Sequence, residues 1–162
     1  MKRILIFGNS GSGKSTLARH LATTYDIAHL DLDTLAWLPT SPPQRMPIED
    51  SSKNIMTFIE QNPQWVVEGC YTDLLKLLDS HANEIIFMDL SISLCVENAK
   101  RRPWEPHKYA SKAAQDKNLS FLIEWIKQYR TRVDTFSYKS HEEFYNTFIG
   151  EKVRYTQNTS IT

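Results

Sequence analysis

Near its N-terminus the chain reads Ile4-Leu5-Ile6-Phe7-Gly8-Asn9-Ser10-Gly11-Ser12-Gly13-Lys14-Ser15. The second part, residues 8–15, has the pattern G-x-x-x-x-G-K-S. In a loop of this pattern the glycines let the backbone turn its N–H groups inward, where they bind a di- or triphosphate. The lysine reaches the outer phosphates, and the hydroxyl that follows it binds Mg²⁺. The stretch therefore predicts a nucleotide-phosphate loop.

The residues on either side support this interpretation. The apolar run at 4–7 is typical of a strand buried on both faces, and Leu17, Leu21 and Tyr25 recur on one helical face. A helix that starts at the loop adds its positive N-terminal dipole to the anion site. A plain glycine-rich turn between strand and helix is the alternative. We expect the nucleotide to contact Gly8, Asn9, Ser10, Gly11, Ser12, Gly13, Lys14, Ser15 and Thr16.

Length and composition narrow the class of protein. The 162 residues fit one domain, 1–162, with a substantial core. A net charge of zero gives no general argument for binding nucleic acid or an anionic membrane, and no apolar stretch is long enough to span a bilayer. The two cysteines lack C-x-x-C spacing, so we expect reduced thiols and a cytoplasmic location.

Strand and helix patterns alternate along the chain. Short apolar runs at 28–31, 65–68 and 84–89 predict further strands, and helical patterns separate them. This alternation is typical of an α/β protein with a parallel sheet covered on both faces. Four prolines between Pro39 and Pro47 predict a long loop, and residues 104–117 are expected to be irregular.

Carboxylates stand at the ends of two predicted strands. Asp31 and Asp33 follow one of them and Glu68 ends another, and ligands bind beyond the carboxyl ends of parallel strands. We expect Ser15 and Asp31 to serve Mg²⁺, and Asp33 to bond to an acceptor hydroxyl or take its proton. Glu68 either orients the waters of the metal ion or contacts the substrate. The alternatives are a capped turn at Asp31 and Asp33 and a solvated strand end at Glu68.

A basic stretch lies in the second half of the chain. Between residues 100 and 132 there are nine Lys or Arg and three acidic residues. Arginines placed over a moving phosphoryl group stabilise its charge. Arg101 and Arg102, at a helix end, are the first candidates. Arg130 and Arg132, on a long helix predicted over 119–136, are the second candidates. A solvated charged face is the alternative. Trp37 either stacks on a ligand ring or anchors its loop.

Five stretches of the sequence form a recognisable set. They are Ile-Phe-Gly-Asn-Ser-Gly-Ser-Gly-Lys-Ser at 6–15, His-Leu-Asp-Leu-Asp-Thr-Leu-Ala-Trp-Leu-Pro at 29–39, Trp-Val-Val-Glu-Gly-Cys-Tyr at 65–71, Ile-Ile-Phe-Met-Asp-Leu at 85–90 and the Arg-Arg pair at 101–102. Together they resemble the adenylate-kinase-related P-loop small-molecule kinases, and most closely bacterial topology modulation proteins, which are FlaR-related.

The resemblance implies a three-layer fold with a five-stranded parallel sheet and helices on both faces. It also implies an acceptor-binding region at about 33–62 and a lid at about 102–117. The Asp-x-Asp at 31 and 33 is similar to that of shikimate-kinase-like enzymes, in which the first Asp assists Mg²⁺ and the second contacts the acceptor hydroxyl. The Asp-Gly-x-Pro-Arg signature of adenylate kinases is absent, which argues against AMP as the acceptor.

The sequence thus favours an ATP- and Mg²⁺-dependent phosphotransferase for a small hydroxyl- or phosphate-bearing acceptor. In it, Lys14, Asp33, Arg101, Arg102 and Arg130 act in catalysis, and Asp33, Trp37 and Glu68 bind the substrate. One alternative is a nucleic-acid-associated protein that binds a nucleotide. Another is a nucleotide switch or weak ATPase, although no Asn-Lys-x-Asp guanine signature occurs. We expect no membrane partner and a monomer or dimer.

Overall fold

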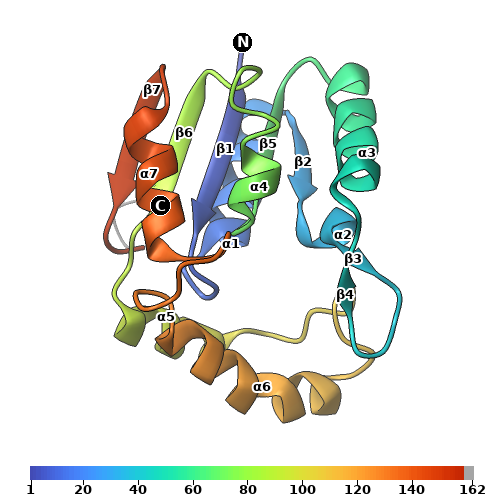
Figure 1. Ribbon diagram of the computed structural model, residues 1–162, viewed down its shortest axis with the longest axis vertical. Helices are drawn as coiled ribbons and strands as arrows, with labels where there is room; N and C mark the ends of the chain where they lie inside the picture. The colour runs from blue at the N-terminus through green and yellow to red at the C-terminus, as the bar shows by residue number, and fades with distance from the viewer. Residues whose placement is uncertain (159–162) are drawn as a thin grey trace.

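Five parallel strands form one sheet in the order β2-β5-β1-β6-β7 (Figure 1). The computed structural model describes residues 1–158. The strands are β1 (Arg3–Gly8), β2 (Ala28–Asp31), β5 (Trp65–Glu68), β6 (Glu84–Met88) and β7 (Glu151–Tyr155). Because β1 lies at the centre and pairs with both β5 and β6, the predicted phosphate loop leaves the middle of the sheet.

The apolar run of β1 supplies both faces of the sheet with core residues. Leu5 and Phe7 pack into one hydrophobic cluster, whereas Ile4 and Ile6 pack into a second one on the opposite face. All four side chains are buried, which explains why the strand is apolar throughout rather than alternating.

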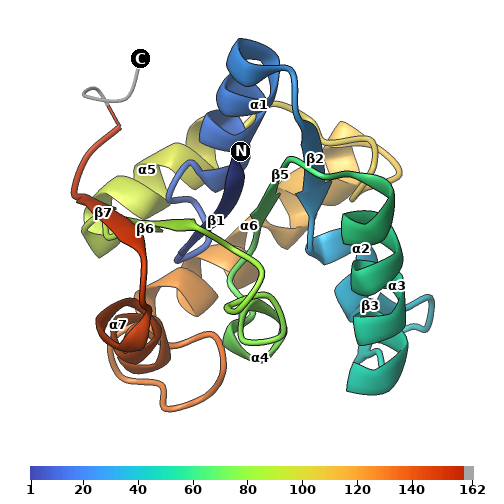
Figure 2. The ribbon, with the colours of Figure 1, turned by 90° about the horizontal axis from the view of Figure 1, so that it is seen from above.

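Helices cover both faces (Figure 2). The Leu5 face packs against α3 (Ile48–Gln61), α4 (Thr72–Leu75) and α7 (Tyr138–Thr147), and the Ile4 face against α1 (Lys14–Tyr25), α5 (Ile92–Arg101) and α6 (Lys112–Lys127). The predicted three-layer α/β fold with a five-stranded parallel sheet is therefore confirmed.

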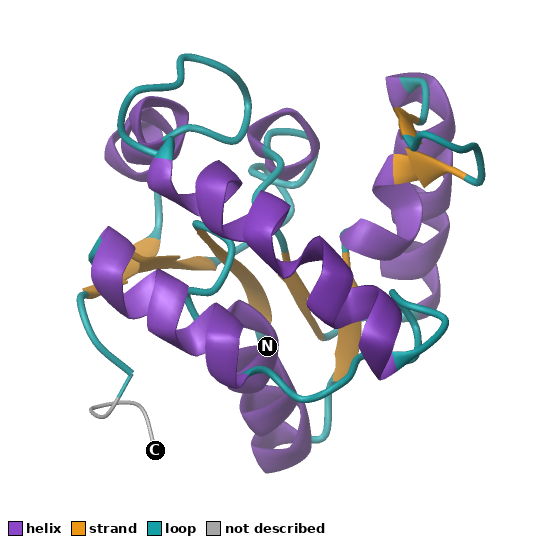
Figure 3. Cartoon of the chain, turned by 90° about the horizontal axis from the view of Figure 1, so that it is seen from below, coloured by secondary structure: helices purple, strands orange, loops and turns teal. Residues whose placement is uncertain are grey.

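Helix α6 lies across the carboxyl ends of the strands (Figures 1 and 3). The irregular segment between α5 and α6 passes over the same edge of the sheet. This arrangement encloses the edge where ligands bind in parallel sheets. No helix within residues 1–158 is both long enough and apolar enough to cross a bilayer.

The segment after β2 contains more regular structure than its prolines predict. Helix α2 (Asp33–Ala36) is followed by a small antiparallel hairpin of β3 (Trp37–Leu38) and β4 (Gln44–Arg45). The sequence prediction of one long loop was wrong because Pro39, Pro42 and Pro43 occupy only the turn of this hairpin, and Pro47 precedes the first residue of α3.

The helix predicted over 119–136 has different limits. It begins at Lys112, because the Ser111 hydroxyl accepts a hydrogen bond from the backbone N–H of Ala114 at 3.1 Å and caps it. It ends at Lys127, where the chain enters a series of turns. The irregular segment is therefore 102–111, and Arg130 lies in a turn rather than on a helix. The predicted helix over 119–136 and the predicted irregular segment over 104–117 are both corrected in this way.

Candidate active site

The loop of residues 8–15, called the phosphate loop below, joins β1 to α1. Gly11 has φ 78° and Gly13, which precedes the first residue of α1, has φ 88°. Side chains rarely adopt such angles, and a Cβ at Gly11 would also collide with the carbonyl oxygen of Cys95. These positions accept only glycine without distortion, and they let the backbone approach α5 closely.

Hydrogen bonds to two distant helices hold the loop in place. The Asn9 side-chain amide donates to the carbonyl oxygen of Ile126 at the end of α6, at 3.2 Å. The Asn98 amide on α5 donates to the carbonyl oxygen of Gly11 at 2.8 Å. The backbone N–H of Ser12 closes the turn by donating to the Asn9 carbonyl at 3.2 Å. The loop is thus ordered by the protein itself.

The two functional residues of the motif have different partners. The Lys14 ammonium donates to the carbonyl oxygen of Asn9 at 2.7 Å and remains inside the loop. The Ser15 hydroxyl donates to Glu68 Oε1 at 2.9 Å, and Glu68 is 2% exposed. The other Glu68 oxygen lies 2.9 Å from His29 Nε2. Glu68 therefore belongs with the Ser15 hydroxyl, on the phosphate side of the site.

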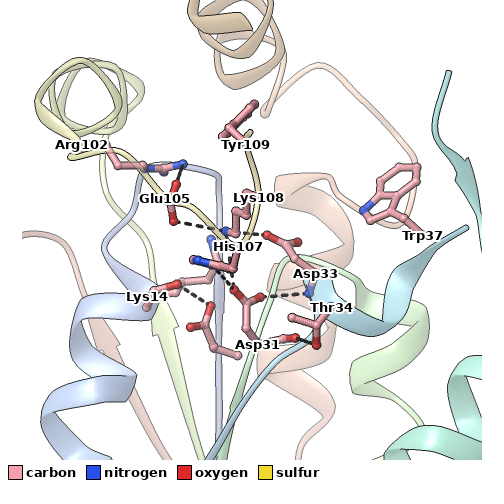
Figure 4. A network of polar contacts seen from close by, with 12 residues as sticks. Lys14, Asp31, Asp33, Thr34, Trp37, Arg102, Glu105, His107, Lys108 and Tyr109 are labelled. Carbon is pink, nitrogen blue, oxygen red and sulfur yellow. Dashed lines mark hydrogen bonds and ion pairs between the residues drawn. The ribbon is translucent and has the colours of Figure 1, made fainter. Parts of the chain in front are cut away.

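Asp31 and Asp33 meet at the end of β2, where a lysine lies between them (Figure 4). Lys108 Nζ is 2.7 Å from Asp33 Oδ2 and 3.5 Å from Asp31 Oδ2, and 3.6 Å from Glu105 Oε2. The Asp33 backbone N–H donates to Asp31 Oδ1 at 2.9 Å. His107 Nε2 is 3.8 Å from Asp31. The contact of Lys108 with Asp31 and Asp33 was not predicted. In the sequence Lys108 is one of several basic residues between 100 and 132, and no local spacing connects it to β2.

The charges in this cluster shift each other's pKa. Burial and the neighbouring carboxylates of Asp33 and Glu68 raise the pKa of Asp31. Burial also acts to raise the pKa of Asp33, but the Lys108 ammonium outweighs it and lowers that pKa. Burial acts to lower the pKa of Lys108, yet Asp33 and Asp31 raise it well above its ordinary value. Lys108 is therefore charged, and Asp33 is held ionised.

Tyr71 is a further member of the site that sequence reasoning missed. Its hydroxyl donates to Asp33 Oδ1 and accepts from the Trp37 indole N–H at 2.8 Å. Trp37 also contacts the Tyr71 ring edge to face, with centroids 6.3 Å apart. Trp37 reaches Asp33 only through Tyr71. The position of Tyr71, three residues after Glu68, carries no signal in the sequence, because its contact with Asp33 depends on how β5 and α2 pack.

One cavity of about 690 Å³ collects most of these groups. Lys14, Ser15 and Thr16 line one part of it, and Asp31 and Asp33 line another. The segment between α5 and α6 supplies a wall that includes Arg101, Arg102, Glu105, His107 and Lys108. Among the described residues, Trp37 and Arg130 are not part of its lining.

The predicted arginines have different surroundings. Arg102 donates to Glu105 Oε1 at 3.2 Å, and Arg101 lies 4.0 Å from Glu97 with its side chain 77% exposed. Both line the cavity. Arg130 instead lies 3.4 Å from Asp89 and stacks over the Tyr138 ring at 4.2 Å. The structure thus brings the pair at the end of α5 to the cavity and leaves Arg130 beside β6.

The donor groups fit a nucleotide and a hydrated Mg²⁺. Backbone N–H groups of a loop and the Lys14 ammonium suit phosphate oxygens. The Ser15 hydroxyl, with Glu68 and Asp31 nearby, suits an ion that keeps several waters and takes few protein oxygens. Within residues 1–158 no group of three or more His, Cys, Asp or Glu side chains converges to hold a metal ion alone.

Comparisons with known proteins place the chain in a family. Residues 4–120 match the family described as AAA domain (AAA_18), and the chain belongs to that family. The chain is also similar to "Uncharacterized protein YqaC" of Bacillus subtilis (strain 168), with 26% identity over 131 residues, 79% of this chain and 72% of YqaC.

Two solved kinase structures share the fold. A gluconokinase from Sinorhizobium meliloti 1021 aligns with TM-score 0.50 and 17% identity over 98% of this chain and 85% of its own. A deoxyadenosine kinase from M. mycoides with bound dATP aligns with TM-score 0.53 and 14% identity over 96% and 91%. The chain is therefore a P-loop protein with a kinase-like fold. A closer relation to topology modulation proteins stays a prediction.

Proposed function

We propose that the chain is an ATP- and Mg²⁺-dependent phosphotransferase that acts on a small hydroxyl- or phosphate-bearing acceptor. One observation carries the proposal: a single cavity contains Lys14 and Ser15 in one part and Asp31 and Asp33 in another. A donor phosphate and an acceptor group bound in these two parts would meet inside the same cavity. A phosphate loop alone would fit a nucleotide switch equally well.

On the donor side, the phosphate loop would bind the ATP phosphates through its backbone N–H groups. Lys14 would exchange the Asn9 carbonyl for phosphate oxygens, because a charged donor bonds more strongly to an anion than to a carbonyl. Mg²⁺ would neutralise part of the phosphate charge. The Ser15 hydroxyl would bind this ion, and Asp31 and Glu68 would orient its water ligands. Glu68 is thus assigned to the metal side rather than to the acceptor.

On the acceptor side, Asp33 would bond to the acceptor hydroxyl and orient it toward the phosphate. Tyr71 occupies Oδ1 of this carboxylate and fixes its rotation. Trp37 was predicted to touch the acceptor, but its indole N–H holds Tyr71, so we assign it to supporting Tyr71. Arg101 and Arg102 would cover the moving phosphoryl group from the lid side. Arg130 has no corresponding place in the cavity.

The distribution of ion pairs argues against a nucleic-acid function. Seven of the nine basic residues between 100 and 132 have a carboxylate within 4.0 Å: Arg101, Arg102, Lys108, Lys112, Lys127, Arg130 and Arg132. Charge that is already paired contributes less to binding a phosphate backbone.

Cys70 and Cys95 are both free, which fits the proposed cytoplasmic location.

The test is ADP release from ATP and Mg²⁺ in the presence of a panel of acceptors. The panel includes sugar acids and deoxynucleosides, because the two similar solved structures are a gluconokinase and a deoxyadenosine kinase. Nucleoside monophosphates, sugars and shikimate-like hydroxy acids complete it. If the chain is a kinase, we expect one acceptor to raise the rate of ADP release well above the rate with water alone. A uniformly flat panel, with ATP bound, would instead support the switch or weak ATPase.

A further inference from the structure

The segment 102–111, called the lid segment below, has little apolar anchoring. None of its residues belongs to the buried core. Polar contacts attach it to the start of α6: the Glu105 N–H donates to Gln115 Oε1 at 2.8 Å, and Gln115 Nε2 donates to the Pro103 carbonyl at 3.0 Å. The Trp104 indole N–H donates to the Tyr109 carbonyl at 3.0 Å. The segment thus has a defined shape that does not depend on contacts with the sheet.

Charge joins the lid segment to the opposite side of the cavity. Lys108 lies within 3.5 Å of both Asp31 and Asp33, and His107 lies 3.8 Å from Asp31 (Figure 4). The Lys108 side chain is 22% exposed, that of Asp31 13% and that of Asp33 34%. Charges that are partly shielded from water attract each other more strongly than charges on the open surface. Lys108 is therefore the main connection across the cavity.

The same contact occupies the acceptor carboxylate. Tyr71 donates to Asp33 Oδ1, and Lys108 is 2.7 Å from Asp33 Oδ2, so both oxygens already have a strong donor. A hydroxyl that is to bond to Asp33 has to compete with an ammonium for Oδ2. Because the ammonium adds the attraction of a full positive charge to its hydrogen bond with the carboxylate, a neutral hydroxyl is the weaker competitor.

We propose that Lys108 is an autoinhibitory latch, which holds the lid segment closed over Asp31 and Asp33 in the free protein. Release of Lys108 opens this end of the cavity and frees Asp33 Oδ2. The identification of Asp33 with the acceptor rests on the proposed function, whereas the latch itself is a property of the free protein. Its test therefore uses neither nucleotide nor acceptor.

Cys70 provides a native probe of opening, because it is half-buried and lines the cavity, whereas Cys95 is fully buried. The rate at which a maleimide modifies Cys70 is measured on the full chain, and peptide mass spectrometry identifies the modified thiol. Burial raises the pKa of Cys70 to about 12, and the charge of Lys108 acts against that rise. Loss of the Lys108 charge alone would therefore slow the reaction, so a faster rate reports opening.

We expect Lys108→Met to raise the Cys70 rate at least about fivefold, because the closed state loses its ion pairs. Lys108→Arg, which keeps the charge, should remain near the wild-type rate. The matched control is Lys112→Met, which removes an exposed lysine paired with Asp116 at the start of α6 and should leave the rate unchanged. In about 0.5 M NaCl the wild-type rate should rise toward that of Lys108→Met, because salt screens ion pairs.

The proposal is overturned if Lys108→Met, with wild-type circular dichroism and thermal midpoint, reacts no faster than the wild type. The salt dependence of the wild-type rate is the second measurement, in case Lys108→Met does not fold. A wild-type rate that does not rise in about 0.5 M NaCl would also exclude the latch. If no acceptor raises turnover but Lys108→Met still speeds the modification of Cys70, the result contradicts the kinase proposal and supports the latch.

Discussion

The phosphate loop and the lid segment line the same cavity but are held in opposite ways. The loop is fixed by its own backbone, with Gly11 packed against α5 and Asn9 bonded to α6. The lid segment is held across the cavity by side-chain charges that converge on Lys108. Backbone packing gives a permanent shape, whereas ion pairs can be exchanged for others. We therefore expect the phosphate loop to keep its shape and the lid segment to be able to move.

The largest expected effect comes from Gly11→Ala. Its φ of 78° and the nearby Cys95 carbonyl leave no space for a methyl group, so the loop and α5 must move apart. We expect a loss of roughly 2–4 kcal/mol in the free energy of unfolding together with loss of nucleotide binding. Urea denaturation and nucleotide titration measure both. Ser10→Ala in the same loop is the control, and equal stability of the two variants would contradict a backbone-fixed loop.

Lys14→Ala should act on binding without affecting the fold. Within residues 1–158 its ammonium bonds only to the Asn9 carbonyl, so the free energy of unfolding should change little. Loss of a charged donor to phosphate should weaken ATP binding by about 10–100-fold, that is about 1.5–3 kcal/mol. Isothermal titration calorimetry measures the affinity. Unchanged affinity would mean that the loop binds phosphate without this lysine.

His141 is hydrogen-bonded to Cys70, which lines the cavity. A pH titration of stability can test whether this buried contact is as fixed as the phosphate loop. The His141 Nε2–H donates to the Cys70 carbonyl at 2.8 Å, and its Nδ1 therefore accepts from the Tyr129 hydroxyl at 2.6 Å. Burial lowers the pKa of His141 to about 3. The unfolded chain, with a histidine pKa of about 6.5, takes up the proton first, so stability falls as the pH drops below about 6.5.

From about pH 7 to pH 4.5 this histidine alone should remove roughly 2–3 kcal/mol from the free energy of unfolding. His141→Gln can still accept from Tyr129 and donate to Cys70 but does not titrate, so it should lack this loss. Urea denaturation at both pH values measures the difference, and His81→Gln, at an exposed site, is the control. The same pH dependence in wild type and His141→Gln would show that His141 does not remain neutral.

The smallest effect on stability is expected for Arg101→Gln. Its guanidinium is 4.0 Å from Glu97, and both side chains are largely exposed, so the free energy of unfolding should change by less than about 0.5 kcal/mol. A fall in acceptor-stimulated turnover at unchanged stability would support its proposed role over the phosphoryl group. Lys100→Gln is the neighbouring control. Equal turnover in both variants would remove Arg101 from the site.

The strands and the phosphate loop could be predicted because their signals are local. The apolar run of β1 and the glycine spacing of residues 8–15 each specify a backbone conformation within a few residues. The ends of helices and the hairpin after β2 were predicted less well. They depend on single capping bonds such as Ser111 to Ala114, and on which prolines fall in a turn, and neither produces a periodic pattern.

The partners within the site could not be predicted for a related reason. Glu68 reaches Ser15 across 53 residues and Tyr71 reaches Asp33 across 38. Two acidic residues after a strand indicate a polar edge, but they do not say which cation or hydroxyl will face them. That depends on how α6 and the segment before it lie over the sheet.

The sequence by itself determined the phosphate loop, because a nest of backbone N–H groups needs only glycines and a lysine at the correct spacing. Only the tertiary structure decided that Lys108 covers Asp31 and Asp33, and that Tyr71 and Lys108 share the two oxygens of Asp33. The physical reason is the range of the interactions involved. Backbone torsions act between neighbours in the chain, whereas ion pairs join any charges that packing brings within a few ångströms.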